Sequence, residues 1–306
     1  MPTTSFCAFL AGVSYLFISV ASAQTVPTRI PMTSIADKKI VPVSINGSGP
    51  YNFLLDTGSN VTLVDRRLLH ELRISGTDPV TITTVLGETS QQRGMSARSL
   101  SIGGLSVQHV ALTTFDGPQV FRFDEPVQGI LGQNFLEQFD LLIDNDQQTL
   151  TLDPGSNLAV SLAGERLQIS RLGILNFAAT SDRLIVKLKV PSYVQKPLLF
   201  LVDSGANTAV LYPGQGGLAI RAMQGSQSAD LAGLDRRQTC RIQKTTVELG
   251  TAKFREIDLA TCEGLTRNKM DTDGVLPTRV FHRLFISYKE GYMIANPRPA
   301  EGVGAP

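Results

Sequence analysis

The sequence is poor in the residues that carry metal and thiol chemistry. Its 306 residues include only three cysteines and three histidines, and it has no tryptophan. These cysteines and histidines are scattered along the chain and do not show the paired spacing of a zinc site. Isolated histidines are typical of surface or strand positions. We therefore expect neither a metal ion nor another cofactor.

The sequence also lacks an excess of charge of either sign. Lysine and arginine total 28, aspartate and glutamate total 27, and the formal net charge is +1. Without a basic excess, neither nucleic acid nor anionic lipid is the expected main partner. Hydrophobic residues make up 42% of the chain, which is enough to bury a core. The 27 glycines and 16 prolines indicate many turns and favour a β-rich fold.

Long apolar runs are missing except near the N-terminus. Residues 6–20 are apolar apart from two serines and a tyrosine, and Ala21-Ser22-Ala23 follows them. An apolar run of about 15 residues ending in this way is typical of a cleaved signal peptide, whereas a membrane-spanning helix needs about 20. No basic residue precedes the run, so an uncleaved anchor stays open as the alternative. We expect residues 1–23 to be removed, leaving a secreted or periplasmic protein with no stable membrane insertion.

The remaining chain repeats itself. The segment 51–60 (YNFLLDTGSN) is similar to the segment 197–207 (PLLFLVDSGAN). The aspartates in these segments lie 147 positions apart (203 minus 56). Further along, Gly129-Ile130-Leu131-Gly132 matches Gly274-Val275-Leu276-Pro277 after a slip of two residues, and an apolar hairpin pattern follows each of them.

This repeat predicts an internal duplication and a division of the chain. Period-2 alternation dominates, and long helical stripes are absent, so the expected fold class is all-β. We predict a first module over residues 24–154 and a second over 182–297. The connector, residues 155–181, contains some apolar alternation that could add a strand. Residues 298–306 are rich in proline, glycine and alanine and are expected to form a flexible tail.

Each module carries an aspartate from an apolar strand into a glycine turn. Asp56 follows Phe53-Leu54-Leu55, and Asp203 follows Phe200-Leu201-Val202. A carboxylate at the edge of a core is costly unless it is paired or hydrogen-bonded. One such triplet alone fits a turn in which aspartate caps its own loop. Its recurrence at the matching position predicts that a pseudo-twofold axis brings the two carboxylates together, where they would share one proton.

The two motifs, Asp56-Thr57-Gly58-Ser59 and Asp203-Ser204-Gly205-Ala206, resemble those of aspartic proteases. The short modules are more similar to retropepsins than to the longer lobes of pepsin. This resemblance implies two pseudo-twofold-related retropepsin-like β-barrels with an active-site cleft between them, in a pseudo-dimeric monomer. A homodimer with sites between chains is the alternative, which two half-sites in one chain make unnecessary. Pro277 departs from the family pattern, which has glycine there, and lacks an N–H donor.

The resemblance also implies roles for the residues of these motifs. Asp56 and Asp203 would be the catalytic dyad, and Thr57 and Ser204 would hydrogen-bond across the pseudo-axis. The supporting glycines, which would let backbone N–H groups approach the carboxylates, are Gly58 and Gly205.

One position differs between the two loops. The hydroxyl of Ser59 would bond to the adjacent carboxylate, whereas Ala206 offers no such bond. We therefore expect Asp203 to hold the shared proton more often than Asp56.

Family members cover the substrate with a β-hairpin flap. The candidate tips are near Gly87 in the first module and Gly233 in the second, with an ordinary exposed turn as the alternative at both. No tyrosine occurs between residues 80 and 94, so the flap would be retropepsin-like, with one possible from each half.

The sequence thus predicts an exported aspartic endopeptidase that hydrolyses peptide bonds of an extended polypeptide. Water activated between two carboxylates would be the nucleophile. The alternative is a non-catalytic peptide-binding module that keeps the fold. Pro277 and the Ser59/Ala206 asymmetry are the reasons to consider it.

Cys240 and Cys262 are the two cysteines left after removal of the signal peptide. A hairpin centred on Thr251 would place them opposite each other across two strands. An even number of cysteines in an oxidising compartment favours a disulfide. Two buried free thiols are the alternative.

Overall fold

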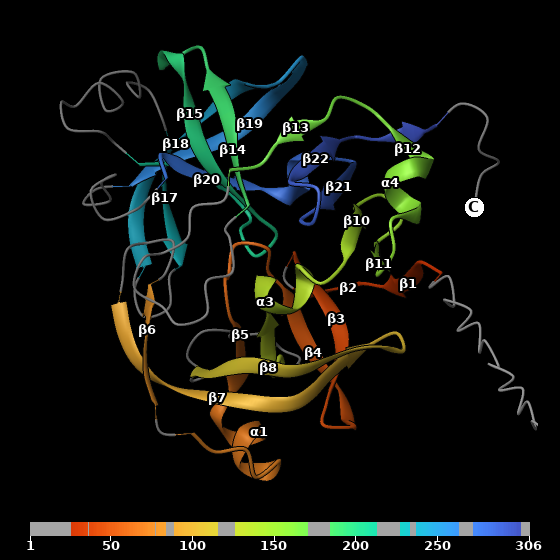
Figure 1. Cartoon of the computed structure of the whole chain (residues 1–306). Helices are drawn as coiled ribbons and strands as arrows, with labels where there is room; N and C mark the ends of the chain where they lie inside the picture. The colour runs from red at the N-terminus through yellow and green to blue at the C-terminus, as the bar shows by residue number, and fades with distance from the viewer. Residues whose placement is uncertain are drawn as a thin grey trace, which may run out of the picture.

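The computed structural model describes residues 26–35, 37–76, 78–83, 89–115, 126–170, 184–212, 227–232, 237–262 and 272–300. The predicted signal peptide, residues 1–23, and both predicted flap tips, Gly87 and Gly233, lie outside these ranges. In the described part of the chain, no helix has the length and apolar character needed to cross a membrane. The described residues are mostly in β-strands (Figure 1), which confirms the predicted all-β class.

The first half of the chain forms a sheet of eight strands in the order β2-β3-β4-β9-β5-β8-β7-β6. An additional β3–β7 pairing curls this sheet into a barrel. Its strands are β2 (Thr33–Ile35), β3 (Lys38–Ile45), β4 (Ser48–Leu55), β5 (Thr62–Asp65), β6 (Asp78–Thr83), β7 (Thr89–Ile102), β8 (Leu105–Phe115) and β9 (Gly129–Leu131). Two short helices, α1 (Arg66–Glu71) and α3 (Gln133–Leu136), accompany them.

The hairpin of β3 and β4 shows how local sequence builds this barrel. Val41, Val43 and Ile45 alternate along β3 and are all buried. Asn46 and Gly47 form the turn, and both have positive φ, 52° and 83°. A two-residue hairpin turn of this kind requires positive φ at both positions, which asparagine and glycine accept most readily.

The second half forms a sheet of seven strands in the order β14-β15-β20-β16-β19-β18-β17. An additional β14–β18 pairing closes it in the same way. Its strands are β14 (Ile185–Val190), β15 (Val194–Asp203), β16 (Ala209–Leu211), β17 (Gln227–Ala232), β18 (Arg237–Leu249), β19 (Ala252–Cys262) and β20 (Gly274–Pro277), and η2 (Thr278–Val280) follows β20.

The two barrels have equivalent strand orders when the first is read from β3 and the second from β14. The strand directions agree too, because β4–β9 and β15–β20 are parallel pairs, as are β5–β8 and β16–β19. Figure 1 shows one barrel above the other, with β6 and β17 on the same side of the molecule.

A third sheet joins the halves. Its order is β1-β11-β10-β21-β22-β13, and β10 pairs with β21 across the two halves. Its strands are β1 (Thr28–Pro31), β10 (Asp140–Asp144), β11 (Thr149–Asp153), β13 (Leu167–Gln168), β21 (Arg283–Ser287) and β22 (Tyr292–Ala295). One hydrophobic cluster runs from the first half into the second and includes Phe53, Phe135, Phe200 and Phe281. The relative position of the two barrels is therefore set by paired backbone and by a shared core.

The connector between the halves is partly structured. It contributes α4 (Asn157–Ser161), β12 (Leu162–Ala163) and β13, which pairs with β22. The first two residues of the predicted flexible tail are in a strand: Arg298–Pro299 forms β23 and pairs with β12. In this pairing the backbone of Arg298–Pro299 is held against β12. Amino-acid composition alone does not reveal such a partner strand. Residues 301–306 lie outside the described ranges.

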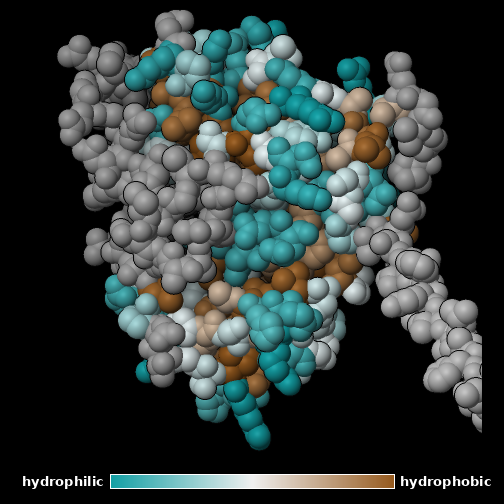
Figure 2. Space-filling model, in the orientation of Figure 1, coloured by the Kyte–Doolittle hydropathy of each residue, from teal (hydrophilic) through white to brown (hydrophobic). Residues whose placement is uncertain are grey.

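On the face shown in Figure 2, hydrophilic and hydrophobic residues are interspersed, and hydrophilic residues extend across the middle between the two barrels. Two large hydrophobic residues, Val26 and Val160, are 75% and 71% exposed. They are far apart in the sequence, and single exposed apolar residues of this kind are normal.

Cys240 and Cys262 face each other in the register of β18 and β19, and their sulfurs form a disulfide. Both residues are 1% exposed and pack with Ile185, Leu201 and Val275. The turn is centred between Gly250 and Thr251 and not on Thr251 as predicted, since Leu249 pairs with Ala252. A register shift between Thr245 and Val247 brings the cysteines opposite each other.

Reduction of this disulfide is expected to lower the free energy of unfolding by about 2–4 kcal/mol, because the bond restricts the unfolded chain. Denaturant unfolding with and without dithiothreitol measures the difference. The Cys240→Ala/Cys262→Ala variant is the control and should not respond to reductant. Two free thiols in the denatured, unreduced protein would contradict the bond.

Candidate active site

Asp56 and Asp203 stand at equivalent places in the two barrels. Asp56 follows the end of β4, which lies beside β9, and Asp203 is the last residue of β15, which lies beside β20. The residues just before them, Leu55 and Val202, are fully buried. Each aspartate therefore begins its loop from backbone that is fixed by a parallel strand pair and by the core.

The two loops bind each other through reciprocal hydrogen bonds. The backbone N–H of Thr57 donates to Oγ of Ser204, and the N–H of Ser204 donates to Oγ1 of Thr57, both over 3.0 Å. Each hydroxyl also donates to a carbonyl of the opposite half, Thr57 to Val202 at 2.9 Å and Ser204 to Leu55 at 2.7 Å. Both side chains are buried, at 0% and 2% exposure. All four bonds are thus shielded from water and hold the loops at one separation.

Backbone N–H groups support the two carboxyls in the same manner. Oδ1 of Asp56 accepts from Gly58 at 2.8 Å and from Ser59 at 3.0 Å. Oδ1 of Asp203 accepts from Gly205 at 2.6 Å and from Ala206 at 3.1 Å. These bonds orient one oxygen of each carboxyl and leave the other for its partner or for a ligand.

Glycine is required in both loops because the opposite carboxyl approaches it closely. A Cβ atom on Gly58 would lie 2.5 Å from Cγ of Asp203, and one on Gly205 would lie 2.8 Å from Cγ of Asp56. Non-bonded carbon atoms do not come this close to each other, so any residue larger than glycine would displace the opposite carboxyl. The loops are therefore built around the contact between the two aspartates.

The electrostatics of the pair are those of two carboxyls that share a proton. Burial raises the pKa of Asp56 well above its ordinary value of 3.8. The neighbouring charge of Asp203 and a hydrogen bond between the two side chains raise it further, against the N–H groups of Gly58 and Ser59. Two acidic groups this close do not both ionise at mildly acidic pH. One carboxyl can therefore hold a proton while the other is ionised.

Comparison with known families agrees with this geometry. Residues 41–135, which include Asp56 and its loop, match the family model described as aspartyl protease. This part of the chain is therefore similar to aspartyl proteases. A comparison with curated proteins finds no match to the chain. The match spans the first barrel from within β3 to within α3.

The side-chain bond predicted between Ser59 and Asp56, both described residues, is absent. Oγ of Ser59 donates to the carbonyl of Val61 at 2.7 Å, inside its own turn, and the contact to Asp56 is made by its backbone N–H. Ala206 supplies the same backbone contact to Asp203. The Ser59/Ala206 difference therefore does not make the two carboxyls unequal.

Lys38 supplies an asymmetry that sequence reasoning missed. Its ammonium group donates to the carbonyl of Gly205, and its charge attracts Asp203 more strongly than Asp56. Burial is the largest effect on Lys38 and lowers its pKa, while the two aspartates counteract this. The charge of Lys38 therefore favours ionised Asp203 and a proton on Asp56, whereas the Ser59/Ala206 difference predicts the opposite preference. The only signal in the sequence was a pair of lysines at the start of an otherwise apolar strand segment.

Pro277 is compensated by a second difference between the two barrels. In the first barrel, the N–H of Gly132 donates to Oγ1 of Thr62 at 3.1 Å. In the second barrel, Pro277 takes the place of this glycine and has no N–H. The residue 147 positions after Thr62 is Ala209, which has no acceptor. Donor and acceptor are absent together, so no polar group is left unpaired by the change.

Replacing Asp56 by asparagine is expected to raise the thermal midpoint at pH 7. Because the folded pKa of Asp56 is raised, its stabilising contribution is complete below about 3.8 and is lost as the pH rises through the folded value. Neutral asparagine does not suffer this loss, so the gain over wild type should vanish near pH 3. Asp258→Asn, at an exposed ion pair with Lys244, is the control. A midpoint for Asp56→Asn at or below wild type at pH 7 would place the proton elsewhere.

Proposed function

We propose that this chain is an exported aspartic endopeptidase that hydrolyses peptide bonds of polypeptides bound in extended conformation. The observation that carries the proposal is the pair of loops from separate barrels, joined by reciprocal Thr57 and Ser204 hydrogen bonds, with the two carboxyls in contact. The aspartyl protease match to residues 41–135 supports the same chemistry.

The unequal surroundings of the two aspartates suggest a role for each. The charge of Lys38 interacts more strongly with Asp203 than with Asp56. Asp203 therefore acts as the base and takes a proton from a water molecule. The water oxygen attacks the peptide carbonyl carbon while protonated Asp56 donates to the carbonyl oxygen. The resulting tetrahedral diol breaks its C–N bond as Asp203 returns its proton to the amine nitrogen and a hydroxyl proton returns to Asp56. The carboxylic acid and amine products leave both aspartates in their starting states.

We further propose that the two halves are related by a pseudo-twofold axis through the dyad and that the protein acts as a monomer. The equivalent strand orders and the reciprocal bonds between the loops support this relation. An extended substrate would lie between the barrels and add strand-like hydrogen bonds. The pairs β6–β7 and β17–β18 flank the predicted tips near Gly87 and Gly233 and would cover it.

Export rests on the predicted signal peptide, residues 1–23. The Cys240–Cys262 disulfide supports this proposal, because structural disulfides persist mainly in oxidising compartments.

The test is cleavage of a reduced and alkylated protein that lacks fixed structure. The chain from Gln24 onward should release new amino groups from it, most rapidly at acidic pH, where the dyad carries one proton. Asp203→Asn should release them at a rate lower by about 10³-fold or more, and the surface variant Asp258→Asn should match wild type. Binding of the unfolded protein without cleavage would instead support the peptide-binding alternative. Equal cleavage by wild type and Asp203→Asn would exclude this dyad as the catalyst.

A further inference from the structure

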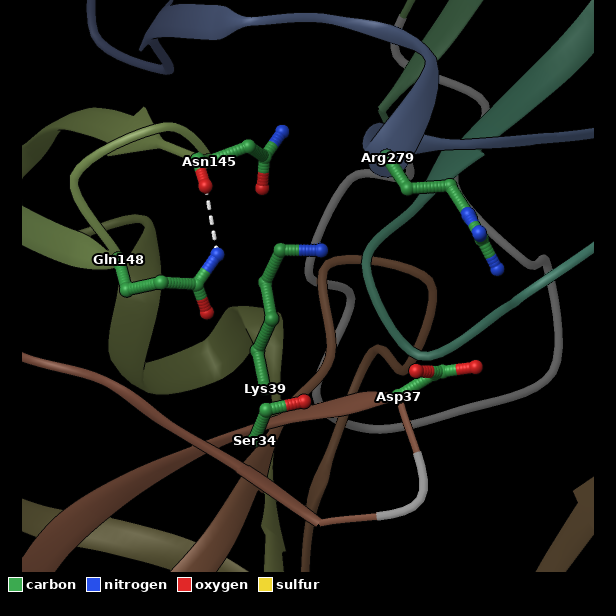
Figure 3. Close-up of a pocket in the computed structure, with 6 residues that line it drawn as sticks. All are labelled: Ser34, Asp37, Lys39, Asn145, Gln148 and Arg279. Carbon is green, nitrogen blue, oxygen red and sulfur yellow. Dashed lines mark hydrogen bonds between the residues drawn. The ribbon is translucent and has the colours of Figure 1, made fainter.

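A polar pocket of about 240 Å³ lies where the two halves meet. Its lining residues come from β2, the turn before β3, β3 itself, the β10–β11 turn and η2; they are Ser34, Asp37, Lys39, Asn145, Gln148 and Arg279. Figure 3 shows the side chain of Lys39 rising through the centre, with Asn145 and Gln148 on one side and Arg279 and Asp37 on the other. The volume exceeds the roughly 30 Å³ that one water molecule occupies in the liquid.

The two cations of this pocket lack counterions among the described residues. Lys39 is only 8% exposed, and its ammonium group contacts the neutral hydroxyl of Thr278 at 3.4 Å. Arg279 is exposed. No carboxylate of the described ranges lies within 4.0 Å of either cation, Asp37 included. Burying an ammonium group without an anion destabilises the protein, so an anion bound in the pocket would be stabilising.

The surrounding charges add to this destabilisation. The pKa of Lys39 is lowered to about 8, mainly by burial and also by repulsion from Arg279 and Lys38, while Asp203 opposes the shift. These groups, together with Asp37 in the lining, are the charged residues that face Lys39. Three cations thus gather beside one carboxylate and a dyad that shares a proton. An added anion would relieve their mutual repulsion.

The neutral lining indicates where an anion fits. Nδ2 of Asn145 is occupied by the carbonyls of Thr278 and Phe281, at 2.9 and 2.7 Å, and its Oδ1 is a buried acceptor without a partner. Nε2 of Gln148 donates to the carbonyl of Asn145 at 2.5 Å. Since an acceptor oxygen repels an anion, the favourable position lies directly between the Lys39 ammonium group and Arg279, away from both Asn145 and the carboxylate of Asp37 on the Arg279 side.

We propose that this pocket binds a small oxyanion between Lys39 and Arg279. Both partners are cationic donors, and arginine presents a planar fork that suits carboxylate, sulfate and phosphate. A bound oxyanion favours protonated Lys39, so binding takes up protons near pH 8. It also offsets positive charge beside the catalytic loop of Asp203, which links occupancy of the pocket to the dyad.

Calorimetric titration with sodium sulfate tests the proposal, because sulfate keeps its charge across the pH range needed. Sodium chloride at the same ionic strength serves as the reference for screening. Wild type should bind one sulfate saturably at pH 7 and more weakly at pH 9, where Lys39 has lost its proton. Lys39→Met and Arg279→Gln should each weaken binding by roughly tenfold or more, because each removes a charged donor.

Matched controls are available on exposed strand positions: Lys187→Met for Lys39→Met, and Arg241→Gln for Arg279→Gln. Both controls should bind sulfate as wild type does. If Lys39→Met does not fold, the Arg279→Gln variant tests the proposal by itself. The Arg279 side chain is exposed, so its replacement should leave the fold intact. Absence of saturable sulfate binding, or equal affinity in Arg279→Gln and Arg241→Gln, would overturn the proposal.

Acetate and inorganic phosphate in the same titration distinguish the sources of the anion. Acetate competing as well as sulfate would point to a peptide carboxylate, and preference for sulfate and phosphate would point to a free inorganic ion. Heat of binding is measured without any cleavage, so this result stands apart from the success or failure of the peptidase proposal.

Discussion

Asp56→Asn and Asp203→Asn are each expected to lower kcat for cleavage of an unfolded protein by about 10³-fold or more. Proton transfer by a positioned acid or base commonly contributes 10²- to 10⁴-fold, and here one shared proton serves both functions. Removing either carboxyl leaves the other without the partner that holds or accepts this proton. The Asp56→Asn/Asp203→Asn double variant should therefore fall little below either single variant.

Initial rates across pH 3–8, measured on protein whose fold is checked by circular dichroism, give the comparison. Asp258→Asn again serves as the control for loss of a surface carboxylate. Losses that multiply in the double variant would show that the two aspartates act independently. A single variant that keeps most of its activity would remove that aspartate from the mechanism.

Gly58→Ala is expected to lower kcat by about 100-fold while the fold remains. The new Cβ would lie 2.5 Å from Cγ of Asp203 and 2.7 Å from its Oδ2. Asp203 is tied by backbone bonds from Gly205 and Ala206, so it moves only by weakening them. Displacement of a catalytic group by about 1 Å can cost two orders of magnitude in rate.

The control for this variant is Gly104→Ala in the turn between β7 and β8. Nothing lies within 4 Å of a Cβ built there, but the φ of Gly104 is +87°. This substitution should cost roughly 1 kcal/mol of stability through backbone strain and leave kcat unchanged. Near-normal kcat in Gly58→Ala would mean that the carboxyls are less tightly apposed than the structure has them.

Local sequence alone determined the β class, the first hairpin and the positions of the two aspartates. Alternation of apolar residues marks buried strands because successive side chains point to opposite faces. The Asn46-Gly47 turn is readable because few residue types accept positive φ. The two Asp-Thr/Ser-Gly triplets are readable because each demands a small residue and a short hydroxyl at fixed places. These features depend on neighbours along the chain.

Tertiary structure decided the features that depend on distant neighbours. The hydroxyl of Ser59 bonds to Val61 instead of Asp56, and the amine of Lys38 reaches Gly205 from the other half of the chain. The side of the dyad that holds the proton, the pairing of Arg298–Pro299 and the pocket around Lys39 follow from such contacts. The hydrogen-bond partner of a side chain and its pKa depend on which groups meet in space and on how deeply they are buried. Neither can be predicted from the residues next to it in the sequence.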